Sequence, residues 1–142
     1  MKRLIVDVRP GEYTVMRLAP DAAVPSGLLD LTDCLVSVTR TPDELSIICP
    51  AEAAVAQDAA FELGWRLLTV RGPLEFTLTG IMAALAGELA AAGVTLFAVS
   101  TYDTDHLLVK QADLGRAVLA LRAAGHETVV PQEPNTSLRG LK

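Results

Sequence analysis

Basic residues are in the minority in this chain of 142 residues: 12 lysines and arginines stand against 17 aspartates and glutamates, for a formal net charge of −5. Aromatic residues are scarcer still, at 4%. A nucleic-acid partner is disfavoured, because binding phosphates needs a basic face. An anionic membrane surface is disfavoured for the same reason.

Long apolar runs are also missing. The apolar run after residues 1–3 is interrupted by Asp7, so no export signal is expected. The longest run, residues 81–94, contains Gly87 and Glu88 and is too short to span a bilayer. These absences predict a cytoplasmic protein that does not enter a membrane.

Cysteine is limited to Cys34 and Cys49, with no CxxC or Cys/His grouping. The two fall on neighbouring predicted strands and could face each other, but a reducing compartment favours buried thiols. We expect no disulfide function, no metal and no cofactor.

What the chain does contain is apolar residues, 51% of the total, and an internal repeat. Residues 37–48 align without gaps on residues 98–109, and each segment is typical of a strand, a polar turn and a second strand. The same offset of 61 places Ala51 on Ala112 and Gly64 on Gly125, which predicts an Ala-rich helix after each hairpin. Residues 12–20 resemble residues 65–73 at a smaller offset, which implies a shortened first helix in the first copy.

The sequence thus predicts an α+β protein of two tandem βαββαβ units, with antiparallel sheets and helices packed on one face. The first unit spans residues 1–63 and has an additional strand at residues 4–8. The second, complete unit spans residues 64–130, and residues 131–142 form a flexible tail. The strands and helices of the second unit are expected at residues 67–71, 79–92, 95–100, 105–110, 112–124 and 127–130.

The helix at residues 79–92 is apolar almost all round, with Glu88 its only charge, so a second surface should cover it. That cover is either the other unit or another chain. Together with an exposed edge at the strand of residues 4–8, this helix predicts a homodimer.

Two segments of the second unit carry candidate ligand-binding groups. Thr79-Gly80-Ile81 opens a helix, with Thr77 or Thr79 as its N-cap, and free N–H groups there can receive a carboxylate. Ser100, Thr101, Thr104 and Asp105 occupy a hairpin turn expected at the same sheet edge, where an Asp can pair with an ammonium group. The alternatives are an ordinary capped helix and ordinary turn chemistry.

The segments 41–50, 64–66, 72–81 and 97–109 resemble the ACT domain family, small ferredoxin-like regulatory modules that bind amino acids in aspartokinases and related proteins, and above all its CASTOR-like group. The resemblance implies a ligand bound between paired ACT units, often at a subunit interface. It carries over to nine residues of this chain: Leu78, Thr79, Gly80, Ile81, Val99, Ser100, Thr101, Thr104 and Asp105. The first unit has Thr39, Arg40 and Glu44 where the second has Ser100, Thr101 and Asp105, so one site per chain is expected.

Other chemistry has less support in the sequence. His106 with Asp103 and Asp105 resembles a metal-ligand group, but neighbouring side chains on a strand point to opposite faces. No spacing suggests a catalytic constellation, and Arg40, Arg66 and Arg71 are expected to be solvated strand-edge charges. The sequence therefore favours a non-catalytic regulatory protein that binds a small molecule, a free amino acid above all. The alternative is an interaction module that keeps the fold and has lost the ligand.

Overall fold

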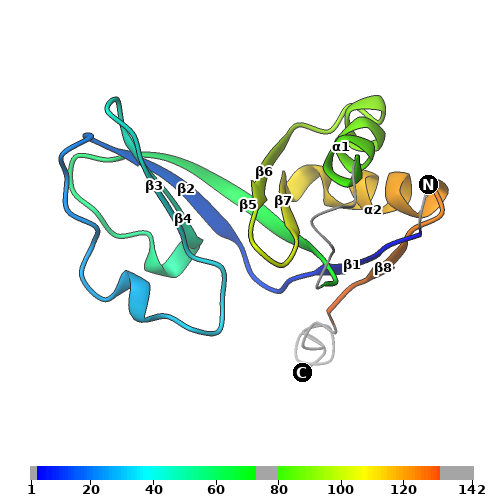
Figure 1. Ribbon diagram of the computed structural model, residues 1–142, viewed down its shortest axis with the longest axis horizontal. Helices are drawn as coiled ribbons and strands as arrows, with labels where there is room; N and C mark the ends of the chain where they lie inside the picture. Colours follow the sequence, from blue (N-terminus) through cyan, green and yellow to red (C-terminus); the bar gives the residue numbers. More distant parts are fainter. Residues whose placement is uncertain (1–2, 73–79, 132–142) are drawn as a thin grey trace, which may run out of the picture.

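One continuous open sheet runs the length of the molecule, and helices cover it only at one end (Figure 1). The computed structural model describes residues 3–72 and 80–131. Its strands are β1 (Ile5–Val8), β2 (Tyr13–Leu18), β3 (Ser37–Arg40), β4 (Leu45–Pro50), β5 (Ala60–Val70), β6 (Leu96–Ser100), β7 (Asp105–Lys110) and β8 (Glu127–Val129). Its helices are α1 (Ile81–Ala91) and α2 (Leu114–Ala123), with the 3₁₀ turns η1 (Leu28–Asp30), η2 (Ala51–Ala53) and η3 (Gln111–Asp113). The mixed α+β architecture and the ferredoxin-like second unit are as predicted.

The long strand β5 joins the two ends of the molecule. Its first half pairs with β2, and its second half pairs with β1 and β7. Between the pairs Val15–Glu62 and Tyr13–Trp65, β5 carries one extra residue, so the ladder contains a bulge. Gly64 lies in this bulge with φ +78°, a conformation that costs glycine little. The predicted boundary after residue 63 therefore falls inside a strand.

The N-terminal strand β1 lies in the interior of the second unit's sheet. It pairs antiparallel with β5 and parallel with β8, which gives the order β6-β7-β5-β1-β8 in this part of the sheet. The expectation that residues 4–8 present an exposed edge is therefore wrong. The chain leaves this sheet after β1, builds the first unit and returns along β5, so the first unit is inserted into the second.

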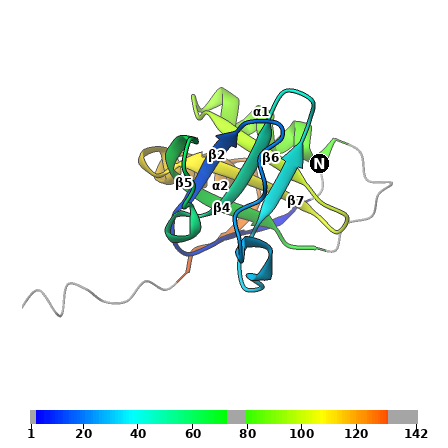
Figure 2. The same cartoon turned by 90° about the vertical axis from the view of Figure 1, so that its left-hand side faces the viewer.

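The repeat is confirmed in the two hairpins, but only the second hairpin is followed by the expected helix. β3–β4 and β6–β7 are both antiparallel hairpins, but their equivalent pairs next to the turn, Arg40–Leu45 and Ser100–Asp105, lie 60 residues apart rather than the predicted 61. The helix expected over residues 51–64 is reduced to η2, and the backbone from Ala60 onward pairs with β2 instead. Strand pairing here overrides the helix propensity of alanine. Figure 2, which looks onto the first unit, shows its sheet flanked by short turns.

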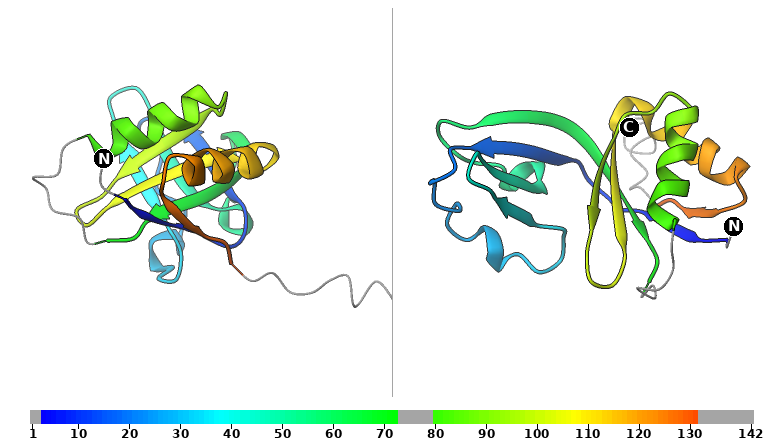
Figure 3. Two further views of the ribbon diagram at one scale, coloured as in Figure 1. Left: turned by 90° about the vertical axis from the view of Figure 1, so that its right-hand side faces the viewer. Right: turned by 45° about the horizontal axis from the view of Figure 1, so that its top comes forward.

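Helices α1 and α2 pack on one face of the second unit's sheet (Figure 3). α1 buries Ile81, Leu85 and Leu89 against the strands, while its outer side carries small residues such as Ala83 and Gly87. The outer side of α1 is thus made largely of alanine and glycine, and the first unit does not pack on it; a cover by another chain stays a prediction. α2 buries Ala117, Val118 and Leu121. No helix within residues 3–72 and 80–131 is long and apolar enough to cross a membrane.

Both helices end as the sequence predicts. Gly93 follows α1 with φ +76°, and its N–H bonds the carbonyl of Ala90 at 3.0 Å while that of Val94 bonds the carbonyl of Leu89 at 2.9 Å. This pair of bonds defines a Schellman cap. Gly125 ends α2 in the same way.

Candidate functional site

The turn between β6 and β7 holds its polar side chains in a fixed network. Ser100 and Asp105 face each other across the hairpin, and the Ser100 hydroxyl donates to Asp105 Oδ1 at 2.7 Å. The Thr101 N–H closes the turn onto the carbonyl of Thr104 at 2.8 Å. Thr104 Oγ1 donates to the carbonyl of Val70 at 2.6 Å, which ties the turn to the end of β5. These hydroxyls and the carboxylate are therefore held in place before any ligand arrives.

Strand alternation places Asp105 on the face of the sheet that the helices cover. Asp105 shares this face with Leu107 and Val109, which pack against the helices in the main core cluster. Val99 lies on the opposite face and packs beside Trp65 and Leu108. Ser100 and Asp105 thus face the α1 side, whereas Val99 does not.

The start of α1 lies at the same end of the second unit as the β6–β7 turn (Figure 3). Its N-cap is Gly80, with φ +79° and no side-chain cap hydrogen bond. A Cβ built on Gly80 would meet no atom of the described residues within 4 Å. The first-turn N–H groups of a helix have no partners within the helix, so this end offers donors to a negatively charged group. Ile81 is 8% exposed and anchors the turn in the core, whereas Leu78, Thr79 and the cap candidate Thr77 lie outside the described residues.

The corresponding positions of the first unit are arranged differently. The Arg40 guanidinium donates to the backbone carbonyls of Pro20 and Ala22. Thr41 closes the β3–β4 turn onto Glu44, with no counterpart of the Ser100–Asp105 bond in the described hydrogen bonds. These contacts support the expectation of one site per chain, which stays a prediction.

His106 contacts two threonine hydroxyls, one of which belongs to another strand, β5. Its Nδ1 lies 3.0 Å from Thr69 Oγ1 and its Nε2 lies 3.4 Å from Thr101 Oγ1, on the face opposite Asp105. A joint metal site with Asp105 is therefore disfavoured by geometry. Among the described residues, no group of three or more His, Cys, Asp or Glu side chains is placed to hold a metal ion.

Burial lowers the pKa of His106 below its ordinary 6.5, and the nearby Arg9 charge lowers it further while Asp105 opposes the shift. The folded state thus binds a proton at this site less readily than the unfolded state. The contribution of His106 to stability is present above pH 6.5 and is lost as the pH falls through the folded-state pKa. We expect the melting temperature to fall between pH 7 and pH 5 less in His106→Gln than in the wild-type chain. Equal slopes, followed by circular dichroism, would contradict this assignment.

The arginines and cysteines differ partly from expectation. Arg66 is only 8% exposed and donates to Gln111 Oε1 at 3.0 Å and to the Arg9 carbonyl at 3.3 Å, so it is not a solvated charge. Arg71 is exposed and forms a two-bond ion pair with Asp7.

Cys49 is buried in β4 and burial raises its pKa to about 11, while Cys34 lies half-buried in the loop before β3 rather than in a strand. Both thiols are free.

Comparisons with known proteins agree with this fold. A family model for the ACT domain matches residues 60–123, from β5 through α2. A separate model for an N-terminal domain family matches residues 11–58. The crystal structure of protein Atu0741 from Agobacterium tumefaciens superposes with a TM-score of 0.83 at 34% identity, covering 94% of this chain and 97% of that one. The chain belongs to the ACT domain family.

Two further proteins are similar over part of their length or in fold alone. The human cytosolic arginine sensor for mTORC1 subunit 1 is 39% identical over 59 residues, which are 41% of this chain and 18% of the sensor. The chain thus spans less than a fifth of the length of that curated relative. The regulatory subunit of aspartate kinase from Thermus thermophilus shares the fold, with a TM-score of 0.61 at 11% identity over 84% of this chain and 96% of that one.

Proposed function

We propose that this protein is a non-catalytic regulatory or sensor protein of the tandem ACT type, which binds a free amino acid in the cytoplasm. The observation that carries the proposal is the position of Asp105: its carboxylate is held by Ser100 on the helix-covered face, at the end of the sheet where α1 begins. The partial similarity to an arginine sensor supports an amino acid as the ligand class.

The two halves of the site match the two charges of an amino acid. The ligand's carboxylate would receive N–H groups at the start of α1, where Gly80 leaves the approach open. The ligand's ammonium group would donate to Asp105 Oδ2 or to the hydroxyl of Ser100. In this assignment Leu78, Thr79, Gly80 and Ile81 form the carboxylate end. Ser100 and Asp105, with Thr101 and Thr104 of the same turn, form the amine end, whereas Val99 faces the other side of the sheet and lies outside it.

A thermal-shift panel of the twenty amino acids tests the proposal. A ligand present at about 100 times its Kd stabilises the native state by roughly 2.7 kcal/mol, which for a chain of this length is a rise of several degrees. We expect a small set of hits in the wild-type chain and none in Asp105→Ala. Asp105→Ala removes one exposed hydrogen bond, so the unliganded melting temperature should change little.

Asp103→Ala is the matched control, because Asp103 is an exposed carboxylate in the same turn. It should keep the full shift. A hit that survives both Asp105→Ala and Gly80→Val would place the pocket elsewhere. An absence of any hit at millimolar ligand would favour the interaction-module alternative.

We also propose a homodimer, now on different surfaces from those the sequence suggested. β6 pairs only with β7 and leaves its other edge open among the described strands. Phe97 on this strand is 37% exposed and packs edge-on against Trp65. A second copy of the chain that pairs along this edge would cover both the open edge of β6 and the exposed part of Phe97. Light scattering at micromolar protein should give twice the chain mass, and a strictly monomeric mass would contradict the dimer.

A further inference from the structure

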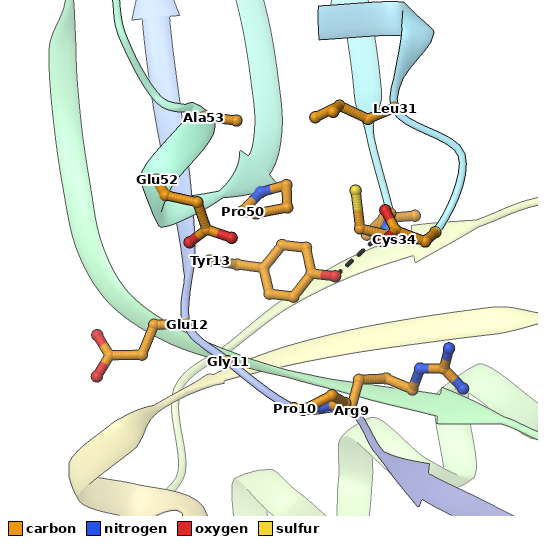
Figure 4. Close-up of a pocket in the computed structure, with 12 residues that line it drawn as sticks. Arg9, Pro10, Gly11, Glu12, Tyr13, Leu31, Cys34, Pro50, Glu52 and Ala53 are labelled. Carbon is orange, nitrogen blue, oxygen red and sulfur yellow. Dashed lines mark hydrogen bonds between the residues drawn. The ribbon is translucent and has the colours of Figure 1, made fainter.

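A cavity of about 460 Å³ lies away from the proposed amino-acid site, where the connection from β1 to β2 meets the first unit (Figure 4). Three separate segments line it: residues 9–13, residues 31–35 and residues 50–53. Its volume is in the range of small-molecule sites, which is about 300–1,000 Å³. Neither the hairpin turn nor the start of α1 contributes to it.

The walls of this cavity are fixed by contacts between the segments. Tyr13 is 4% exposed, and its hydroxyl accepts a hydrogen bond from the Leu35 N–H at 3.3 Å. The Ala51 N–H donates to the carbonyl of Glu12 at 2.9 Å and holds η2 against the start of β2. Tyr13, Pro50 and Leu31 supply an apolar lining. The cavity is therefore preformed rather than a gap between mobile loops.

The charge that faces this cavity is negative. The Glu52 carboxylate points toward the Tyr13 ring, whereas the Arg9 guanidinium and the Glu12 carboxylate point away from it (Figure 4). Asp33 is a second acidic residue of the lining. Within the described part of the chain Glu52 has no hydrogen bond or ion pair, so its charge is not neutralised there.

The negative charge of the cavity lining acts on the Cys34 thiol. Burial raises the pKa of Cys34, and the charges of Asp33 and Glu52 raise it further. Burial also raises the pKa of Tyr13; the hydrogen bond from Leu35 and the charge of Arg9 lower it, whereas the charges of Cys34 and Glu52 raise it.

From the cavity, its tyrosine wall and its facing carboxylate, we propose that this is a second binding site, for a small organic cation such as a primary amine with a short apolar body. The ammonium group pairs with the Glu52 carboxylate and lies against the Tyr13 ring, and the apolar body contacts Pro50 and Leu31. Because residues 9–13 lead from β1 into β2, an occupied cavity fastens the first unit to the strand that leads out of the second.

The test is an NMR titration of the full chain with pentylamine, pentanol and pentanoate, three probes of one length that differ in charge. We expect saturable shifts of the Tyr13, Leu35 and Glu52 amides with pentylamine, weaker binding of pentanol and none of pentanoate. Glu52→Gln should weaken pentylamine binding about tenfold. Asp43→Asn, an exposed carboxylate at the β3–β4 turn, should leave it unchanged.

Three results would overturn the proposal: no saturable shift with millimolar pentylamine, equal binding of amine and alcohol, or undiminished binding by Glu52→Gln. Shifts confined to residues 100–105 would likewise count against it, since they would place the amine at the hairpin turn. Glu52 is exposed, so its substitution leaves the fold intact and the comparison valid.

Discussion

Deletion of residues 1–9 is expected to abolish the cooperative thermal transition of the second unit. The deletion removes β1 from between β5 and β8, and with it the side chains of Leu4, Val6 and Val8, which are at most 4% exposed. Full burial of such side chains contributes about 1.5–3 kcal/mol each, and their sum is comparable to the total stability of a small domain, about 5–15 kcal/mol. β8 would also lose the partner that holds it in the sheet.

Deletion of residues 134–142 is the matched control, because the sequence of this segment has no periodic apolar residues to bury. That truncation should melt at the wild-type temperature. Differential scanning calorimetry of the two truncations decides the point. A sharp transition near the wild-type temperature without residues 1–9 would show that β1 is dispensable.

Leu89→Ala is expected to destabilise the chain by about 2–5 kcal/mol, because Leu89 is 0% exposed where α1 packs on the sheet and truncation leaves a cavity. For a chain of this length the melting temperature should fall by roughly 10 °C. The same change also loosens the helix whose first turn forms half of the proposed amino-acid site.

Leu119→Ala makes the same chemical change on α2, where Leu119 is 67% exposed. Its effect should stay within about 0.5 kcal/mol. Chemical denaturation of both variants measures the difference directly. Similar losses in the two would mean that α1 does not pack as described.

Local patterns in the sequence predicted the hairpins and helix ends of the second unit well. The β6–β7 turn and the Gly93 and Gly125 caps depend on residues close together in the chain, so their signals are readable from sequence alone. The prediction of a helix over residues 51–64 was wrong, because a high alanine content leads to a helix only where no strand competes for the backbone hydrogen bonds. Here β2 offers a full strand ladder to the backbone from Ala60 onward.

The insertion of β1 between β5 and β8 could not be predicted from the repeat. Its pairs join Val6 to Val70 and Val6 to Thr128, and nothing in a single sequence identifies contacts at such separations. The candidate site likewise contains some residues that local sequence signals predict and some contacts that they do not. Gly80 and Asp105 follow from local turn and helix signals, whereas the His106–Thr69 contact and the cavity beside Tyr13 exist only once distant segments meet.

In the proposed function, one free amino acid binds per chain, between the start of α1 and the β6–β7 turn. Isothermal titration of the best thermal-shift hit into the wild-type chain, Asp105→Ala and the control Asp103→Ala tests it most directly. We expect one site per chain in the wild type and in Asp103→Ala, and no measurable binding in Asp105→Ala. Equal affinity in all three proteins would contradict it.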